Sequence, residues 1–225
     1  MSNPVIVAID GPSGTGKSST SRAVAAKLGL SYLDTGAQYR AITWWMLHNG
    51  VDVDDPAAVA DHAAKPAVVS GTDPAAPTVT VDGTDVSGPI RTQAVTAAVS
   101  AVSAVPEVRA RMVGLQRAAA AAATTGIVVE GRDIGTTVLP DATAKIFLTA
   151  SAEARAARRS GELKGAASVA DTQAALMRRD AADSGRKTSP LAKAGDAVEV
   201  DTTELSLEQV IECVVTLVEE KRAAR

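Results

Sequence analysis

Short apolar runs alternate with segments of helical periodicity along most of the chain. Apolar runs typical of buried parallel strands lie at residues 5–9, 31–33, 127–130, 145–148 and 197–200. Helical spacing is found at residues 17–28, 36–49, 171–183 and 206–219, and Ser151 is placed to cap a further helix. Ser206 and Gln209 form a capping box at the start of the last of these helices. Strands that alternate with helices predict an α/β fold built on a doubly wound parallel sheet.

The pattern changes between the second and third of these strands. Asp55 and Pro56 suit the N-cap and first turn of a short helix. At residues 79–86, Asp-Gly interrupts an alternating segment, which predicts a β-hairpin with a type I′ turn. An alanine-rich helical stretch then runs from Thr92 towards Thr124, with a break at Pro106. We therefore expect an insertion into the sheet at this point of the chain.

Composition narrows the classes of function. The chain has 225 residues, of which 46% are hydrophobic, enough for one α/β domain with small subdomains. Aromatic residues make up only 2% and the net charge is −3, which argues against binding of a nucleic-acid polymer. No signal peptide and no apolar run long enough for a membrane span are visible, so we expect no membrane contact and a cytoplasmic location. Cys213 is the one cysteine, and its apolar helical surroundings predict a core position.

A glycine-rich segment carries the clearest chemistry. Residues 11–18, Gly-Pro-Ser-Gly-Thr-Gly-Lys-Ser, match the complete phosphate-loop (P-loop) pattern between a strand and a helix. The backbone N–H groups of such a loop bind phosphate oxygens, Lys17 can neutralise the β- and γ-phosphates, and the Ser18 hydroxyl can bind Mg²⁺. We predict that ATP is bound as its Mg²⁺ complex by Gly11, Pro12, Ser13, Gly14, Thr15, Gly16, Lys17, Ser18 and Ser19. The motif leaves the acceptor open, because P-loops also serve switches and motors.

Several arginine-bearing clusters lie after the predicted strands, where doubly wound sheets bind their ligands. They occur at residues 34–40, 131–136 and 178–186, while Ser100 and Arg109 follow the hairpin. Such clusters predict a second phosphate site opposite the first. Arg155, Arg158 and Arg159 share one face of a predicted helix, which is compatible with either a phosphate-binding face or an ordinary solvated one. Arg132 and Asp133 are compatible with a structural ion pair as well as with a binding role.

The longer motifs resemble the bacterial cytidylate kinase family of P-loop nucleoside-monophosphate kinases. They are IDGPSGTGKSS, LDTGAQYRA, DVSGPIRT, VRARM, GRDIGTTVLPDA, KIFLTAS and RRD-x₂-D-x₂-R. The GRDIGTTVLPDA segment is the most specific, and the long insertion separates the chain from adenylate kinases. The resemblance implies a P-loop NTPase fold with five parallel strands flanked by helices. It places the core at about 1–36, 105–154 and 168–225, a monophosphate-binding insertion at about 37–104 and a lid at about 155–167.

The resemblance also implies transfer of the γ-phosphate of ATP-Mg to CMP or dCMP, giving CDP or dCDP and ADP, in pyrimidine metabolism. It assigns the CMP phosphate to Arg40, Arg132, Arg179 and Arg186, cytosine to Ser100, Arg109 and Asp133, the pentose to Asp183, and the lining of the site to Thr35 and Tyr39. Lys17 and the lid residues Arg155, Arg158 and Arg159 would act on the transferring phosphate. Glu130 stands where relatives often have Asp, and we assign it no role.

The sequence leaves two other functions open. The chain could be a kinase for another small acceptor such as UMP, against which the cytosine-reading residues argue. It could also be a nucleotide-dependent switch or ATPase, although the sequence contains no Asn-Lys-x-Asp guanine motif. We expect a monomer, because many relatives of this fold act alone.

Overall fold

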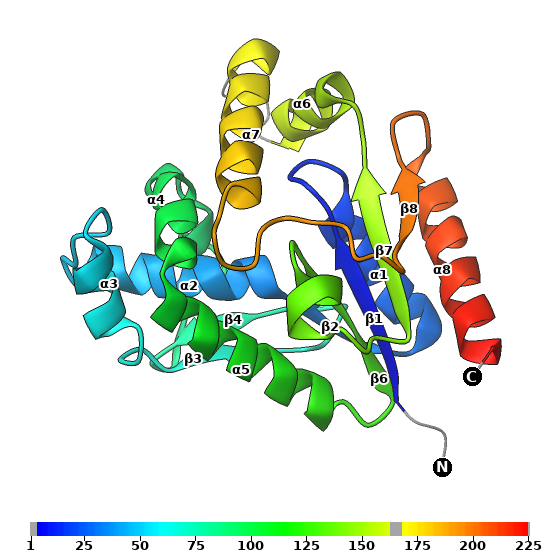
Figure 1. Cartoon of the computed structure of the whole chain (residues 1–225), viewed down its shortest axis with the longest axis horizontal. Coiled ribbons are helices and arrows are strands. Elements are labelled where there is room, and N and C mark those ends of the chain that lie inside the picture. Colours follow the sequence, from blue (N-terminus) through cyan, green and yellow to red (C-terminus); the bar gives the residue numbers. More distant parts are fainter. Residues whose placement is uncertain (1–3, 163–167, 225) are drawn as a thin grey trace.

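A five-stranded parallel sheet forms the centre of the molecule (Figure 1). The computed structural model describes residues 4–162 and 168–224. The strands occur in the order β2 (Ser31–Asp34), β6 (Gly126–Gly131), β1 (Val5–Asp10), β7 (Ala144–Thr149) and β8 (Val198–Asp201), and every neighbouring pair is parallel. All residues of β6 are buried, as a central strand of such a sheet requires. The doubly wound sheet expected from the sequence is confirmed.

Helices cover both faces of this sheet. On one face, Val7 and Ile9 of β1 pack against α1 (Lys17–Leu28) and α8 (Leu207–Ala223). On the other face, Ala8 packs with residues of α5 (Pro106–Ala122) and of the π-helical turn η2 (Ile134–Val138). Successive residues of a strand point to opposite faces, so one apolar run supplies both layers of the core. The layers hold the carboxyl ends of the strands at one edge.

The insertion between β2 and β6 has a hydrophobic core of its own. It contains α2 (Thr35–His48), α3 (Pro56–His62), η1 (Pro89–Arg91), α4 (Gln93–Ala104) and a small antiparallel sheet of β3 (Val68–Ser70), β4 (Val79–Val81) and β5 (Thr84–Asp85). The expected hairpin is confirmed: Asp82 and Gly83 both have positive φ, as a type I′ turn demands. The three-residue strand β3 was not expected, and it pairs with β4.

Two helices stand above the carboxyl edge of the sheet in Figure 1. They are α6 (Ala152–Glu162) and α7 (Val169–Ser184), and they pack against each other. Ser151 caps α6 as expected, with its hydroxyl accepting the N–H of Ala154 at 3.1 Å. The lid boundaries stay a prediction, and residues 163–167 of that lid lie outside the described residues.

One expectation about the core is wrong. Cys213 is exposed on α8, whereas Val210, Ile211, Val214 and Val218 form the buried stripe of this helix. The apolar residues around the cysteine belong to that stripe, and Cys213 itself falls beside it.

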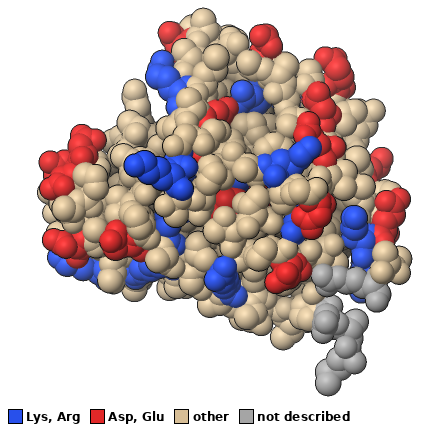
Figure 2. All heavy atoms as spheres, in the orientation of Figure 1, with Lys and Arg blue, Asp and Glu red and all other residues tan. Residues whose placement is uncertain are grey.

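The surface carries both signs of charge. On the face drawn in Figure 2, basic and acidic side chains are interspersed. Within residues 4–162 and 168–224, no helix combines the length and the apolar character needed to cross a membrane.

Candidate active site

The phosphate loop lies between β1 and α1, where the sequence predicts it. Gly11 has φ 145°, and a Cβ there would lie 2.1 Å from the carbonyl oxygen of Leu148 in β7. The loop can therefore pass this close to β7 only because residue 11 is glycine. The Nζ of Lys17 donates to the Pro12 carbonyl inside the loop. Burial, and next the charge of Arg132, lower the pKa of Lys17 well below its ordinary value, which favours a site that receives an anion.

Glu130 lies beside the first turn of α1, a position that the strand order creates by pairing β6 with β1. Its Oε1 accepts hydrogen bonds from the Ser18 hydroxyl at 2.7 Å and from the Tyr32 hydroxyl at 3.0 Å. Within the described chain its Oε2 is buried without a hydrogen-bond partner. Burial, and then the charge of Asp34, raise the pKa of Glu130 to about 7. Sequence reasoning gave this residue no role, although a carboxylate at the end of an apolar strand was the available signal.

A second buried carboxylate shapes the loop after β6. Asp10 ends β1, and its two oxygens accept the backbone N–H groups of Ile134 at 2.9 Å and Gly135 at 2.8 Å. Burial raises the pKa of Asp10 to about 6, and these two hydrogen bonds oppose that rise. The carboxylate thereby fixes the first turn of η2, immediately after Arg132 and Asp133.

Two of the three residues expected to read cytosine come together beside α2 of the insertion. Asp133 and Arg109 form a buried ion pair, and the Arg109 guanidinium also lies over the Tyr39 ring at 5.5 Å. The Ser103 carbonyl accepts a further hydrogen bond from Arg109 at 3.5 Å. The partner of Asp133 is thus Arg109 rather than its neighbour Arg132, so the structural Arg132–Asp133 pair considered above does not form.

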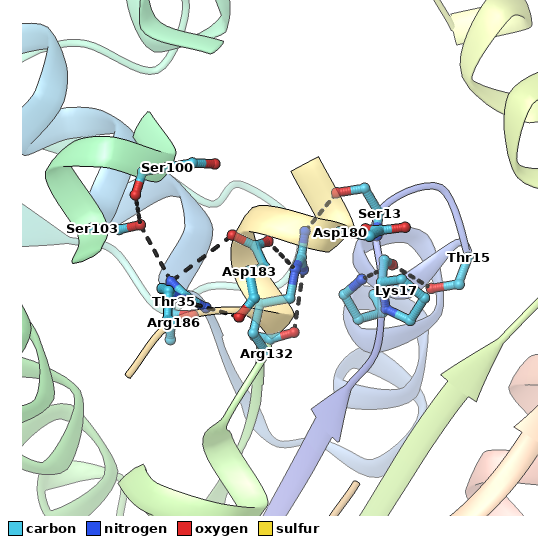
Figure 3. A network of polar contacts seen from close by, with 12 residues as sticks. Ser13, Thr15, Lys17, Thr35, Ser100, Ser103, Arg132, Asp180, Asp183 and Arg186 are labelled. Carbon is cyan, nitrogen blue, oxygen red and sulfur yellow. Dashed lines mark hydrogen bonds and ion pairs between the residues drawn. The ribbon is translucent and has the colours of Figure 1, made fainter. Parts of the chain in front are cut away.

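Arg132 instead joins the acceptor side to the phosphate loop (Figure 3). Its Nε contacts Asp183 at 3.1 Å, and its Nη2 donates to the Ser13 hydroxyl at 2.6 Å. Asp183 lies 3.9 Å from the Nη1 of Arg186, which also donates to the Ser103 hydroxyl at 3.3 Å. Three of the residues expected around CMP, Arg132, Asp183 and Arg186, therefore form one connected group.

Two further arginines, Arg179 and Arg40, lie near this group, and neither forms an ion pair within the described residues. Burial, followed by the charges of Arg132 and Arg40, lowers the pKa of Arg179 to about 9. Burial, followed by the charge of Arg159, lowers the pKa of Arg40 to about 10. In the described part of the chain, the Nε of Arg179 and the Nη2 of Arg186 are buried without hydrogen-bond partners. Positive groups that depress one another's pKa values in this way are suited to binding a phosphate.

The three arginines of α6 have different surroundings, so they do not form a single exposed face. Arg155 is buried, forms an ion pair with Asp180 and donates to the Ser13 carbonyl at 3.2 Å. Arg158 donates to the Thr202 hydroxyl at 2.8 Å, and Arg159 pairs with Glu162 at 2.6 Å. Arg158 thereby borders a hollow beside the phosphate loop, which is lined by Gly14, Thr15, Gly16, Ser19, Thr20, Arg158, Glu162, Thr202, Leu205, Leu207 and Val210.

Thr35 binds a backbone carbonyl through its side chain, whereas Ser100 contributes its own backbone carbonyl to a hydrogen bond. The Thr35 hydroxyl donates to the Glu130 carbonyl at 2.7 Å, and the Ser100 carbonyl accepts the Ser103 hydroxyl at 3.1 Å. Sequence reasoning missed Ser103 and Asp180 as members of the site. Asp180 stands inside the quoted RRD motif, whereas nothing in the sequence pattern distinguishes Ser103 from the other small residues of α4.

Comparisons with known proteins agree with this geometry. The family model for cytidylate kinase matches residues 7–220. The cytidylate kinase of Streptomyces griseus is 80% identical over 98% of this chain and 95% of its own length, and that of Streptomyces coelicolor is 81% identical over the same shares. An uncharacterized protein from Eubacterium ventriosum of known structure shares the fold, with a TM-score of 0.53 at 10% identity over 97% of this chain and 99% of its own. The family model and these relatives span nearly the whole chain, which therefore belongs to the cytidylate kinase family.

Proposed function

We propose that this protein transfers the γ-phosphate of ATP to CMP or dCMP, forming ADP and CDP or dCDP. One observation carries the proposal: a cluster of arginines, in which buried N–H groups of Arg179 and Arg186 have no hydrogen-bond partner within the described residues, lies near both the phosphate loop and the buried Arg109–Asp133 pair. The cations suit an acceptor phosphate, and the ion pair suits a base with both donors and acceptors. Family membership supports the same reaction.

The donor would occupy the phosphate loop and the hollow beside it. Backbone N–H groups at the start of α1 suit the β- and γ-phosphates, and the hollow bordered by Arg158 and Leu207 suits the nucleoside. The Ser18 hydroxyl and the orphaned Oε2 of Glu130 fit the Mg²⁺ that arrives with ATP, because this ion prefers one or two protein oxygens plus phosphates. When bound, Mg²⁺ neutralises phosphate charge. Ser18 and Glu130 would hold it in place.

The acceptor base would lie against Asp133 and Arg109. Cytosine offers an N4 amino group, which a carboxylate accepts, while its ring carbonyl and N3 accept hydrogen bonds from a guanidinium. Within the described chain, Oδ2 of Asp133 accepts a hydrogen bond from Arg109, and Oδ1 accepts none. Uracil has a carbonyl oxygen where cytosine has the amino group, so Asp133 would repel it.

The transfer itself needs alignment and charge neutralisation rather than a strong base. An anionic oxygen of the CMP phosphate would attack the γ-phosphorus in line as the bond to the bridging oxygen of ADP breaks. Lys17, Arg132 and Arg179 lie near one another and would neutralise the charge of the phosphates. Arg155 and Arg159 would contribute when α6 and the insertion close around both substrates.

We infer a cytoplasmic monomer that acts on these small molecules. The contacts described above assemble the donor and acceptor sides from one chain, and ATP and CMP are small cytoplasmic metabolites. The insertion and the lid would act as the moving parts.

The test compares ADP formation with and without CMP. We expect little ATP consumption by the protein alone and rapid ADP formation when CMP is added. Lys17→Met should keep the fold and lower the CMP-dependent rate by about two orders of magnitude or more, because a buried charge next to the transferring phosphate is lost. ATP hydrolysis that is independent of CMP would favour a switch or an ATPase, and near-normal turnover by the folded variant would remove Lys17 from the mechanism.

A further inference from the structure

Ser13 is a junction between the phosphate loop and three other parts of the molecule. Its hydroxyl accepts the Nη2 of Arg132 at 2.6 Å, and its N–H donates to Asp180 of α7 at 3.3 Å. Its carbonyl accepts the Nη1 of Arg155 of α6 at 3.2 Å. Ser13 is only 8% exposed, and Asp180 and Arg155 also pair with each other. The hydroxyl, N–H and carbonyl of Ser13 therefore each form a hydrogen bond with a different segment of the chain.

Arg132 connects this junction to the acceptor side. A guanidinium has five N–H donors in a rigid plane. In the described chain three are used: Nε on Asp183, Nη1 on the Gly131 carbonyl at 3.3 Å, and Nη2 on Ser13. One further N–H on each of Nη1 and Nη2 is thus left for an acceptor phosphate. One rigid group can hold the acceptor and the phosphate loop at the same time.

The connection continues beyond Arg132 to the helix that flanks the base site. Asp183 forms an ion pair with Arg186, and Arg186 donates a hydrogen bond to the Ser103 hydroxyl. The Ser103 hydroxyl in turn donates to the Ser100 carbonyl. Figure 3 shows this series of polar contacts running from Ser100 to the phosphate loop. A ligand that orders the acceptor end therefore acts on groups that are in contact with Ser13.

We propose that Ser13 is a positioning residue that couples the two substrate sites. An acceptor phosphate on Arg132 would fix the guanidinium, and its hydrogen bond from Nη2 to the Ser13 hydroxyl would then order the loop for the donor. Because the first substrate to bind has already ordered the loop, the second substrate binds more tightly. The gain in affinity is the same whichever substrate binds first. The inference rests on the proposed function, because it takes CMP and ATP as the two ligands.

Thr15 provides a matched control in the same loop. Its hydroxyl donates to the Pro12 carbonyl at 3.1 Å, so it stabilises the loop internally, and within the described residues this hydroxyl forms no hydrogen bond with Arg132. Removal of either hydroxyl perturbs the phosphate loop. Only removal of the Ser13 hydroxyl breaks the contact with Arg132.

The experiment measures the Kd of CMP by calorimetry with and without a saturating non-hydrolysable ATP analogue and Mg²⁺. We expect the analogue to tighten CMP binding about fivefold or more in the wild type, a typical size for coupled sites. Ser13→Ala should bring this ratio close to one at an unchanged unfolding midpoint. Thr15→Ala should change the affinity for the analogue while keeping the wild-type ratio. Ser13→Thr, which keeps the hydroxyl, should retain most of the coupling.

Arg132→Lys gives a second route if Ser13→Ala does not fold. A lysine ammonium lacks the planar fork that holds Asp183, Ser13 and a phosphate together, so this variant should also lose the coupling. A wild-type ratio retained in Ser13→Ala, or an equal loss in Thr15→Ala, would overturn the inference. If the wild type binds both ligands without coupling, the inference falls alone; if it binds neither, the proposed function falls with it.

Discussion

Two buried carboxylates near the end of β6 show how surroundings set the chemistry of a residue. Asp133 forms a buried ion pair with Arg109, and we propose that it also accepts a hydrogen bond from the base. Glu130, three residues earlier, faces only hydroxyl donors through Oε1, and burial raises its pKa to about 7. The first suits recognition of a neutral ring, and the second suits contact with a cation that arrives with the donor.

The role of Asp133 can be tested by Asp133→Asn, which keeps the shape of the side chain. The amide oxygen can still accept from Arg109, while the amide nitrogen would face the base as a donor. Cytosine N4 would then meet a donor, and the uracil carbonyl would meet a partner. We expect the CMP-over-UMP ratio of kcat/KM to fall about tenfold or more, the cost of a hydrogen bond to a charged group. A parallel loss for both substrates, with an unchanged ratio, would make Asp133 purely structural.

The sequence could supply these residues but not their partners. Resemblance to a family identified Arg109, Asp133 and Arg132 as members of the acceptor site, and the structure brings them to one cleft. The pairing of Arg132 with Asp183 and Ser13 depends on the distance between segments far apart in the chain. The contact between Glu130 and Ser18 likewise depends on β6 lying next to β1, which local pattern does not encode.

At the scale of elements, capping residues and turn residues predicted helix starts and the hairpin correctly. Asp55 and Ser206 cap the helices that they were expected to cap, and the Asp-Gly turn closes its hairpin. The three-residue strand β3 is too short to show alternation, and its existence depends on pairing with β4. The π-turn η2 depends on Asp10, which lies more than a hundred residues earlier.

The packing of the phosphate loop on β7 predicts the effect of Gly11→Ala. The new Cβ would lie 2.1 Å from the Leu148 carbonyl oxygen at φ 145°, so backbone must move. We expect a loss of about 3 kcal/mol or more in the free energy of unfolding, measured by urea titration.

Gly29→Ala is the control for this variant. Gly29 also has positive φ, at 65°, but among the described residues no atom apart from its chain neighbours lies within 4 Å of the added Cβ. Gly29→Ala should therefore lower the free energy of unfolding by only about 1–2 kcal/mol, the cost of a non-glycine residue in the left-handed region. Equal losses in the two variants would show that close approach to β7 is not what requires Gly11.

At the scale of the whole molecule, the strand order places the donor and acceptor sides at one edge of the sheet. The phosphate loop follows β1 at the centre, Arg132 and Asp133 follow β6, and the insertion follows β2. The helices α6 and α7 lie above the sheet in Figure 1, and their residues Arg155 and Asp180 form hydrogen bonds with Ser13 of the loop. Lys17 and the arginines of the expected site thus come from several separate segments, although the chain carries a net charge of −3.

Label transfer tests the central claim most directly. ATP labelled in its γ-phosphate would be incubated, with Mg²⁺, with CMP, dCMP, UMP, AMP or GMP in turn, and the labelled products separated. The account predicts that label appears in CDP and dCDP at rates at least about tenfold above those for the other nucleotides, since each mismatched buried hydrogen bond costs at least this much. Label released as inorganic phosphate regardless of the acceptor, or transferred to UMP as fast as to CMP, would contradict it.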